Sequence, residues 1–339
     1  MQRLGVFDRF QAVKKGLNIV AIGGGTGLAT LLSGLKWHVS NAEKSGRIAE
    51  LSGIVAVSDD GGSSGRLRDE LQIPPPGDIR NCMVALSEDS SLLSRLFQHR
   101  FAGEGGLHGH SFGNLFLAAL SEVTGDFALA VRLSTEILAS KGHIYPATDS
   151  DVRIAAELAD GSIIQGETKV GHVGAKIKRL FLEPENCSPM PEAIESIKAA
   201  DLITVGPGSL FTSLLPPLLV HGVPEAIETS RAAKIFVCNL MTQPGETDGL
   251  NARRHLEIVR EYAPTLNFDC LIVNRQPISP LQSELYEIEG AEQIGVHGSM
   301  ADETIEGAKV VRADLLADDD SKVRHDPERL ALTVLNCAE

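Results

Sequence analysis

Four loops in this 339-residue chain combine glycine with small polar residues, the residue types that hold phosphate groups or sugar hydroxyls. Each loop directly follows a short apolar run that is typical of a buried strand. In an open parallel sheet, such loops meet beyond the carboxyl ends of the strands, where ligands bind. We therefore expect one shared crevice, formed by Gly23–Gly27, Ser58–Gly65, Gly206–Ser209 and Asn239–Gly245.

The first and third loops are predicted to face phosphate. Glycine allows close approach of the backbone to a ligand, and a following helix adds free N–H groups and partial positive charge. A tight strand-to-helix turn would explain the same glycines. The first loop resembles the dinucleotide-binding fingerprint, but Leu28 stands where its third glycine would fall, and the lysine of a P-loop is missing. We also expect positive φ at Gly208, which would exclude valine there. The candidate residues are Gly24, Gly25, Thr26, Gly27, Gly206, Pro207, Gly208 and Ser209.

The second loop carries two adjacent carboxylates just beyond a strand. Asp59 and Asp60 are followed by Gly61, Ser63 and Ser64. Paired carboxylates are costly to bury unless a cation or hydrogen bonds compensate them. They could accept hydrogen bonds from ribose hydroxyls, or hold Mg²⁺, which prefers oxygen ligands and bridges phosphates. Helix capping in a solvated turn is the alternative.

Two polar residues near predicted helix starts are further candidates. Arg80 is electrostatically misplaced at such a start, which favours an anionic partner for it. Asn114 follows Ser111 at the start of an apolar helix and is expected to face the crevice. His108 and His110 have no third metal ligand at a suitable spacing, so they do not indicate zinc.

The fourth loop offers neutral amides and hydroxyls. Asn239, Thr242 and Gln243 suit the edge of a base or the hydroxyls of a sugar better than phosphate. Tyr286 lies on a predicted helix, where a tyrosine is commonly an edge residue of the core. Arg324 could cap the last helix or reach a phosphate. No Ser-His-Asp or Cys-His arrangement is legible, so no acid–base catalyst can be named.

Strands and helices alternate over most of the chain, which predicts an α/β fold: a Rossmann-like three-layer sandwich with a mostly parallel sheet. The period changes to two at Val152–Leu158, and Asp160-Gly161 is a hairpin turn signal. We therefore expect a small β-hairpin insertion at about 150–182. Residues 17–339 are predicted to form a single domain after an N-terminal lead-in, 1–16, and residues 38–50 are predicted to be a loop.

Composition excludes several classes of partner. A net charge of −14 argues against nucleic acid and anionic membranes, which favour basic proteins. No apolar run approaches 18 residues, so we expect no membrane-spanning helix and no signal peptide, and the five cysteines form no CxxC pair. We expect a cytoplasmic protein with reduced thiols.

Long stretches of the chain resemble the bacterial gluconeogenesis factors of the YvcK type, within the superfamily of 2-phospho-L-lactate transferase, the CofD-like proteins. The resemblance covers about residues 18–336, and is carried by Ile22–Leu28, Ser58–Arg68, Pro75–Asn81, Gly109–Leu115, Leu202–Leu210 and Asn239–Gly249. One departure follows Gly249: the family often has Ser-Asp-His, whereas this chain has Arg254 at the position of the acid.

The resemblance implies a cytoplasmic protein needed for gluconeogenic growth and cell shape. It implies binding of a UDP-sugar, notably UDP-N-acetylglucosamine, control of cell-wall precursor flux, and a homodimer. By motif, Gly24–Gly27 and Gly206–Ser209 would face phosphates, and Asp59 and Asp60 would take the polyol or metal position. Tyr286 and Arg324 would contact the nucleotide sugar.

Three functions are left to distinguish. The first is a nucleotide-sugar-binding regulatory protein of cell-wall enzymes, for which no cofactor is required and Mg²⁺ is an option. The second is a Mg²⁺-dependent transferase that moves a phospholactyl group from a guanosine diphosphate donor to a deazaflavin. The third is a binder of an NAD-type dinucleotide, against which the incomplete fingerprint counts.

Overall fold

A computed structural model describes residues 16–40, 46–87, 92–175, 177–295, 303–319 and 321–338. The expected lead-in therefore lies outside the described residues, apart from Gly16. The described residues contain an eight-stranded sheet in the order β10-β11-β9-β8-β7-β1-β2-β3 and a three-stranded sheet in the order β5-β4-β6. The predicted α/β fold class is confirmed.

The large sheet is parallel except at one edge, where β10 pairs with β11 in the antiparallel sense. Its central strands are buried on both faces, as their unbroken apolar sequences predict. The strands are β1 (Leu17–Gly23), β2 (Ile48–Val55), β3 (His143–Pro146), β7 (Leu202–Val205), β8 (Ala233–Val237), β9 (Cys270–Asn274), β10 (Thr304–Ile305) and β11 (Ala308–Ala313).

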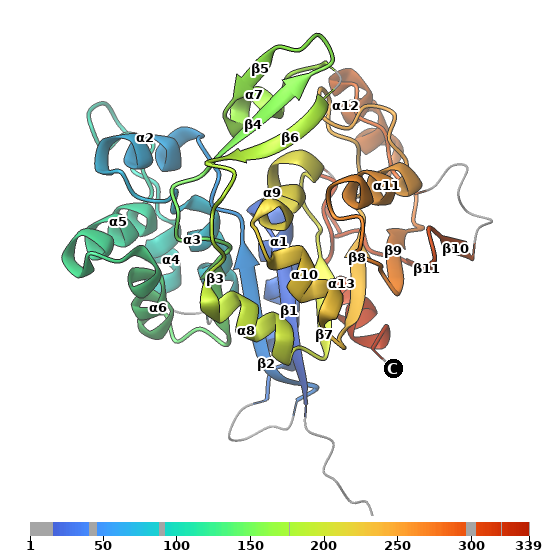
Figure 1. The fold of residues 1–339 in the computed structure, drawn as a ribbon, viewed down its shortest axis with the longest axis horizontal. Coiled ribbons are helices and arrows are strands. Elements are labelled where there is room, and N and C mark those ends of the chain that lie inside the picture. Colours follow the sequence, from blue (N-terminus) through green and yellow to red (C-terminus); the bar gives the residue numbers. More distant parts are fainter. Residues whose placement is uncertain are drawn as a thin grey trace, which may run out of the picture.

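Helices cover both faces of this sheet (Figure 1). One layer contains α1 (Gly25–Leu35), which packs against α3 (Gly77–Leu86) and against α13 (Pro327–Asn336). The other layer contains α8 (Pro191–Ala199), α9 (Leu215–Leu219), α10 (Val223–Thr229) and α11 (Ala252–Tyr262). The remaining helical elements are η1 (Lys36–His38), α2 (Gly62–Leu71), α4 (Leu92–Gln98), α5 (Phe112–Thr124), α6 (Phe127–Ile137), η2 (Leu210–Leu214) and α12 (Pro280–Glu289).

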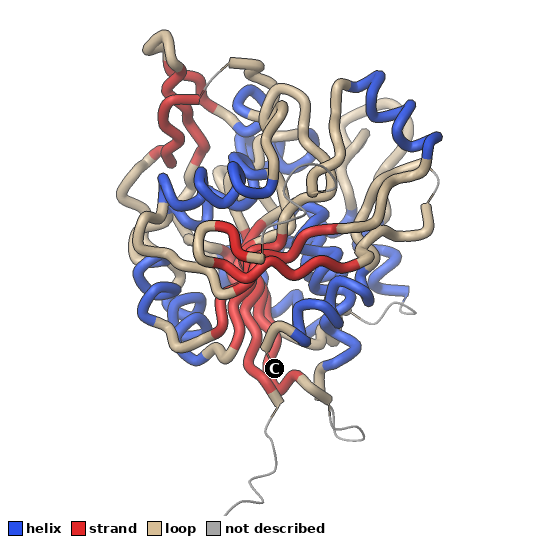
Figure 2. The backbone as a smooth tube through the Cα atoms, turned by 90° about the vertical axis from the view of Figure 1, so that its right-hand side faces the viewer, coloured by secondary structure: helices blue, strands red, loops and turns tan. Residues whose placement is uncertain are grey.

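The expected β insertion is a separate three-stranded sheet that lies above the carboxyl ends of the central strands (Figures 1 and 2). It consists of β4 (Arg153–Leu158), β5 (Ile163–Gln165) and β6 (Ile177–Glu183), with the short helix α7 (Glu167–Val170) between the last two strands. Both β5 and β6 pair antiparallel with β4. The insertion therefore contributes residues to the edge of the molecule where the four loops lie.

The predicted loop at 38–50 is wrong at its end, because β2 begins at Ile48 and pairs with β1 from there. Two strands were not predicted, β3 and β10, which have four and two residues. Such short runs carry too little periodicity to be recognised in a sequence.

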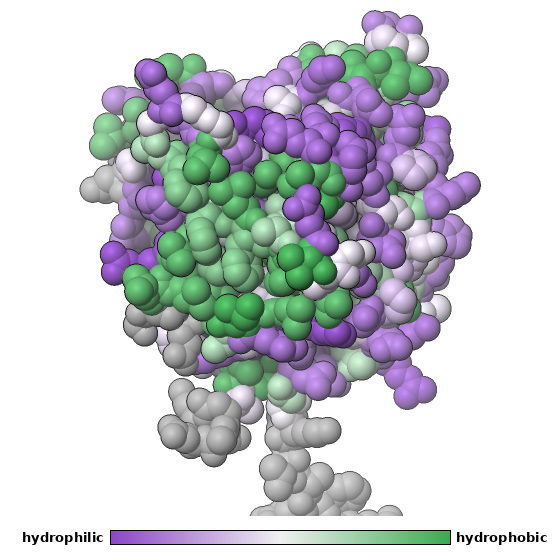
Figure 3. Space-filling view, turned by 90° about the vertical axis from the view of Figure 1, so that its left-hand side faces the viewer, coloured by the Kyte–Doolittle hydropathy of each residue, from purple (hydrophilic) through white to green (hydrophobic). Residues whose placement is uncertain are grey.

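One face of the molecule is conspicuously apolar. Figure 3 shows hydrophobic side chains gathered over the side formed by α4, α5 and α6. Leu92, Val123 and Ile137 are 77%, 83% and 49% exposed there. Within the described residues, no single helix is long and apolar enough to cross a membrane. One pair of helical segments would qualify together by length and composition, although it is bent by 79° at a break: Leu210–Leu219 and Val223–Thr229.

Candidate functional site

A cavity of about 530 Å³ lies where the glycine-containing loops meet. It is bounded by the first, third and fourth loops, by α12, and by the segment that precedes α13. Thirteen of the predicted site residues line it: Gly24, Gly25, Thr26, Gly27, Asp59, Pro207, Gly208, Ser209, Asn239, Thr242, Gln243, Tyr286 and Arg324. The convergence expected of loops beyond parallel strands is therefore present.

The first loop leads directly into α1. Gly24 is the N-cap, and Gly25 has a φ of +63°, which favours glycine. A Cβ on Gly27 would lie 2.4 Å from the carbonyl oxygen of Pro207. Glycine at this position is therefore what lets the first and third loops touch and present one continuous surface to the cavity.

The third and fourth loops are tied together by side-chain amides. Asn239 Oδ1 accepts from the amide of Gly208 at 3.0 Å, and Asn239 Nδ2 donates to the carbonyl of Gly208 at 2.8 Å. Gln243 Nε2 donates to Ser209 Oγ at 2.7 Å. Both ends of the Asn239 amide thus brace the third loop, although the residue also lines the cavity.

The expectation of a positive φ at Gly208 in the third loop is wrong. Positive φ falls at Gly206, with a value of +90°, and not at Gly208. Gly208 is restricted by crowding instead, since a Cβ there would lie 3.1 Å from Leu214 and 3.2 Å from Ser213. Valine at 208 is still disfavoured, but for a steric reason.

The two carboxylates of the second loop point in different directions. Asp59 lines the cavity, and its Oδ1 accepts from the amide of Gly61 at 2.8 Å. Asp60 Oδ1 instead accepts from the amide and the hydroxyl of Thr168 in the insertion, at 3.0 and 2.8 Å. Asp60 does not line the cavity, so the expected Asp59–Asp60 pair does not form there.

Other carboxylates join Asp59 in the cavity wall. Burial, and then the charge of Asp59, raise the pKa of Asp78 to about 6. Burial, followed by the charges of Asp59 and Asp78, also raises the pKa of Glu167 well above its ordinary value. Neither carboxylate was predicted to line the cavity. Asp78 lies within the Pro75–Asn81 motif but was not identified as a site residue, and no motif in the sequence marks Glu167 on α7.

The opposite wall comes from the C-terminal part of the chain. The Tyr286 hydroxyl accepts from the amide of Val323 at 3.0 Å and so fixes the segment that carries Arg324. The Arg324 side chain is exposed and lines both the cavity and a neighbouring hollow of about 350 Å³. Burial lowers the pKa of His325 to about 4, so this imidazole is neutral at physiological pH.

The remaining predicted residues, Gly61, Ser63, Ser64, Arg80, Asn114 and Gly206, do not line this cavity. Ser63 Oγ lies 2.9 Å from His110 Nδ1, and Asn114 Nδ2 donates to Ser63 Oγ at 3.0 Å. The guanidinium of Arg80 donates to Ser111 Oγ. These buried contacts join α2, α3 and α5 behind the second loop, which gives the residues a positioning role.

Metal binding by the protein alone is not supported by the described part of the chain. No group of three or more His, Cys, Asp or Glu residues there could hold a metal ion. Asp59 and Asp78 nevertheless lie on the same cavity. Two carboxylates suffice for Mg²⁺ when phosphate oxygens and water complete its coordination.

Comparison with known proteins gives the family. A family model described as 2-phospho-L-lactate transferase CofD matches residues 19–316. The chain belongs to this family. It is 46% identical to a putative gluconeogenesis factor from Aquifex aeolicus over 96% of this chain and 98% of that protein. It is 42% identical to the gluconeogenesis factor of Bacillus subtilis over 92% of this chain and 95% of that protein.

A solved structure also matches closely. The crystal structure of protein BH3568 from Bacillus halodurans superposes with a TM-score of 0.87 at 43% identity, covering 95% of this chain and 100% of that chain. The resemblance to gluconeogenesis factors and to the CofD family is therefore confirmed, together with the fold that it implied.

Proposed function

We propose that this CofD-family protein binds a nucleotide sugar of the UDP-N-acetylglucosamine type and acts as a regulator. The main support is the contact between the first and third loops, at Gly27 and Pro207, which lines one wall of the cavity with backbone from two glycine-containing turns. Such backbone suits a diphosphate, because glycine lets it come close and the start of α1 adds N–H groups. Thr242, Gln243 and Tyr286 supply the neutral polar groups that suit a base or sugar.

The negative charge of the cavity lining opposes the binding of a diphosphate unless cations offset it. Asp59, Asp78 and Glu167 line it, and they would repel phosphate if all were ionised. Arg324 can offset part of this charge. A Mg²⁺ ion shared between the phosphates and the carboxylates of Asp59 and Asp78 would offset more. We therefore propose that binding depends on Mg²⁺.

The residues that line the cavity favour a regulatory binding protein over an enzyme. Among the described lining residues, no serine hydroxyl is hydrogen-bonded to a histidine; the Ser63–His110 contact lies outside the cavity. The transferase alternative rests on the family match and on carboxylates beside a phosphate-type loop. Phosphoryl-type transfer can proceed through positioning and charge neutralisation alone, so this alternative is also tested.

Calorimetry distinguishes these functions. UDP-N-acetylglucosamine with Mg²⁺ is expected to bind with a dissociation constant of about 1 μM, or about −8 kcal/mol. The sugar nucleotide should be recovered unchanged by chromatography. No heat at millimolar ligand would exclude the proposal. Release of GMP from an activated guanosine phospholactate donor, when a deazaflavin acceptor is added, would instead establish the transferase.

We extend the proposal to the cell. Loss of the gene is expected to impair growth and cell shape on gluconeogenic carbon sources, while growth on glucose continues. The protein is expected in the cytoplasm, where UDP-sugars are made, and its targets would be cell-wall enzymes. Normal growth of a deletion strain on both kinds of carbon source would contradict this role.

The proposed homodimer has a candidate surface in the apolar face over α4, α5 and α6 (Figure 3). Arg95 and Arg132 accompany Glu122 and Glu136 as exposed charged residues on these helices, so one copy can offer each sign of charge to the other. A Val123→Lys change is expected to convert a dimer to a monomer in light scattering. A monomeric parent protein would contradict the dimer.

A further inference from the structure

A hollow of about 350 Å³ adjoins the cavity where the glycine-containing loops meet. The two spaces share three lining residues, Thr26, Thr30 and Arg324. One wall of the hollow is α1, and the facing walls come from α3, through Asn81, and from α4, through Arg95. A ligand held on the glycine-containing loops can therefore extend along α1 into the hollow.

The α1 wall is polar in a way that suits a sugar. Thr26, Thr30 and Ser33 lie at spacings of four and three residues, so they share one face of the helix. The hydroxyls of Thr30 and Ser33 each donate to a helix carbonyl at 2.8 Å, which leaves their oxygens able to accept from a ligand. Asn81 Oδ1 accepts from Arg80, which leaves Asn81 Nδ2 to donate.

The hollow and the cavity differ in charge. Arg95 and Arg324 line the hollow, and its described lining contains no carboxylate. The cavity lining, by contrast, contains Asp59, Asp78, Glu167 and Glu289. Within the described residues, neither guanidinium forms a hydrogen bond or a salt bridge. In a protein with a net charge of −14, two such cations in one hollow favour an anionic ligand group there.

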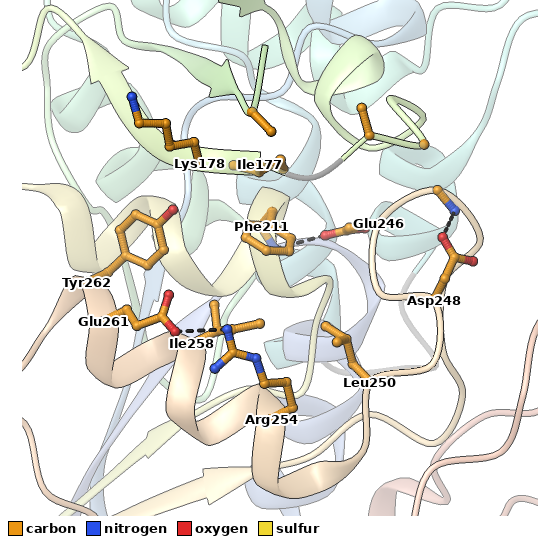
Figure 4. Close-up of a pocket in the computed structure, with 14 residues that line it drawn as sticks. Ile177, Lys178, Phe211, Glu246, Asp248, Leu250, Arg254, Ile258, Glu261 and Tyr262 are labelled. Carbon is orange, nitrogen blue, oxygen red and sulfur yellow. Dashed lines mark hydrogen bonds and ion pairs between the residues drawn. The ribbon is translucent and has the colours of Figure 1, made fainter. Parts of the chain in front are cut away.

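An arginine elsewhere in the protein shows the contrast. Figure 4 shows a cavity of about 810 Å³ between β6 and α11, in which Arg254 pairs with Glu261 at 2.9 Å. Arg254 also contacts Glu257 at 3.1 Å. The protein itself therefore balances the charge of Arg254, whereas the charge of Arg95 is left for a ligand.

The order of the strands places the hollow and the fourth loop on opposite sides of the phosphate-type loops. The fourth loop follows β8, the third follows β7, the first follows β1, and α3 comes after β2, while the sheet order is β8-β7-β1-β2. In a nucleotide sugar, the diphosphate separates the base from the sugar. A diphosphate on the first and third loops therefore directs one end of the ligand to the fourth loop and the other to the hollow.

We propose that the hollow binds a carboxylate on the sugar of the ligand, so that the protein prefers nucleotide sugars with an acidic sugar to those with an uncharged one. This inference rests on the proposed nucleotide-sugar function, and it assigns the base to the fourth loop and the sugar to α1. Arg95 donates to the carboxylate, because a planar guanidinium matches both carboxylate oxygens. Arg324 lies at the boundary, between the carboxylate and the diphosphate.

Calorimetry with two matched pairs of ligands in the presence of Mg²⁺ tests this preference. UDP-glucuronate carries a carboxylate where UDP-glucose has a primary alcohol. UDP-N-acetylmuramate differs from UDP-N-acetylglucosamine by a lactyl ether that ends in a carboxylate. In at least one pair, the acidic member should bind about tenfold more tightly, as expected for one charge-assisted contact. Equal or weaker binding of the acidic member in both pairs would overturn the inference.

Arg95→Gln separates a carboxylate contact from a general effect of charge. It should reduce the preference to about twofold or less, and it should leave the melting temperature unchanged because the side chain is exposed. Arg132→Gln on α6 is the matched control, since it removes an equal charge from an exposed position outside the hollow and should keep the preference. Loss of the preference in both variants, or in neither, would contradict the role of Arg95.

The same titrations distinguish failure of this inference from failure of the proposed function. If none of the four ligands binds, both are overturned. If the ligands bind without a preference for the acidic members, only this inference is overturned. Free glucuronate is finally added to protein saturated with UDP-glucose. Its binding, abolished by Arg95→Gln, would show that the hollow takes a separate anion and not a carboxylate of the sugar.

Discussion

The carboxylate of Asp78 accepts a hydrogen bond from the backbone amide of Gly25 at 2.6 Å. This contact joins the start of α3 to the first turn of α1, and it places an acid where a phosphate-binding loop would otherwise present a free N–H group. Burial raises the pKa of this carboxyl to about 6. The proposed ligand and a proton would therefore bind at the same residue.

Asp78→Asn is expected to stabilise the protein at high pH. The pKa is 3.8 for an ordinary aspartate and about 6 in the folded protein, so the folded state binds the proton more tightly than the unfolded state. The stability that this provides is complete below pH 4 and is lost as pH rises through about 6. Asparagine keeps an acceptor for Gly25 without the charge. The gain in unfolding free energy should be near zero at pH 4 and at most about 3 kcal/mol at pH 7.5. Thermal unfolding at both pH values measures it, and an equal gain at both would contradict this cause.

Asp59→Asn should weaken the binding of UDP-N-acetylglucosamine by about tenfold in the presence of Mg²⁺, as expected for loss of one metal ligand. Asp60→Asn is the matched control, because Asp60 bonds Thr168 and does not line the cavity. Calorimetry with and without EDTA measures both. If Asp59→Asn binds more tightly, the carboxylate only repels phosphate and no metal is shared.

Arg324→Ala should reduce affinity for the same ligand by about 10- to 100-fold, since a charge-assisted hydrogen bond contributes about 1.5–3 kcal/mol. Its melting temperature should not change, because the side chain is exposed. Lys322→Ala removes an equal charge two residues away, outside the cavity lining, and should bind normally. An equal loss of affinity in the two variants would mean that Arg324 acts only through the overall electrostatic potential of the protein.

Gly34→Ala should destabilise the protein although alanine is the better helix former. A Cβ at Gly34 would lie 1.9 Å from the carbonyl oxygen of Pro327, where α1 crosses the start of α13. The clash forces the two helices apart, with a net cost of about 1–3 kcal/mol. Gly106→Ala is the control, since its Cβ would meet nothing within 4 Å. Denaturant unfolding of both variants measures the difference; similar midpoints would show that α13 shifts without cost.

Much of the fold was predictable because its strands are continuous apolar runs and its helices repeat at 3.6 residues. The apolar run predicted to be a strand before the first loop is β1, Leu17–Gly23, and the helix predicted around Tyr286 is α12, Pro280–Glu289. The loops that follow such strands were predictable as neighbours for the same reason. The β3 strand escaped prediction, since its four residues owe their extended form to pairing with β2.

The sequence by itself determined that glycine-containing loops meet at one edge of a parallel sheet, because strand direction places them there. Only the tertiary structure decided which polar side chains enter the cavity. Asp60 was as good a candidate as Asp59, yet Thr168 of the insertion binds it, and Asp78 and Glu167 line the cavity instead. The direction of a side chain depends on partners more than a hundred residues away, such as Thr168, and local sequence patterns carry no information about those partners.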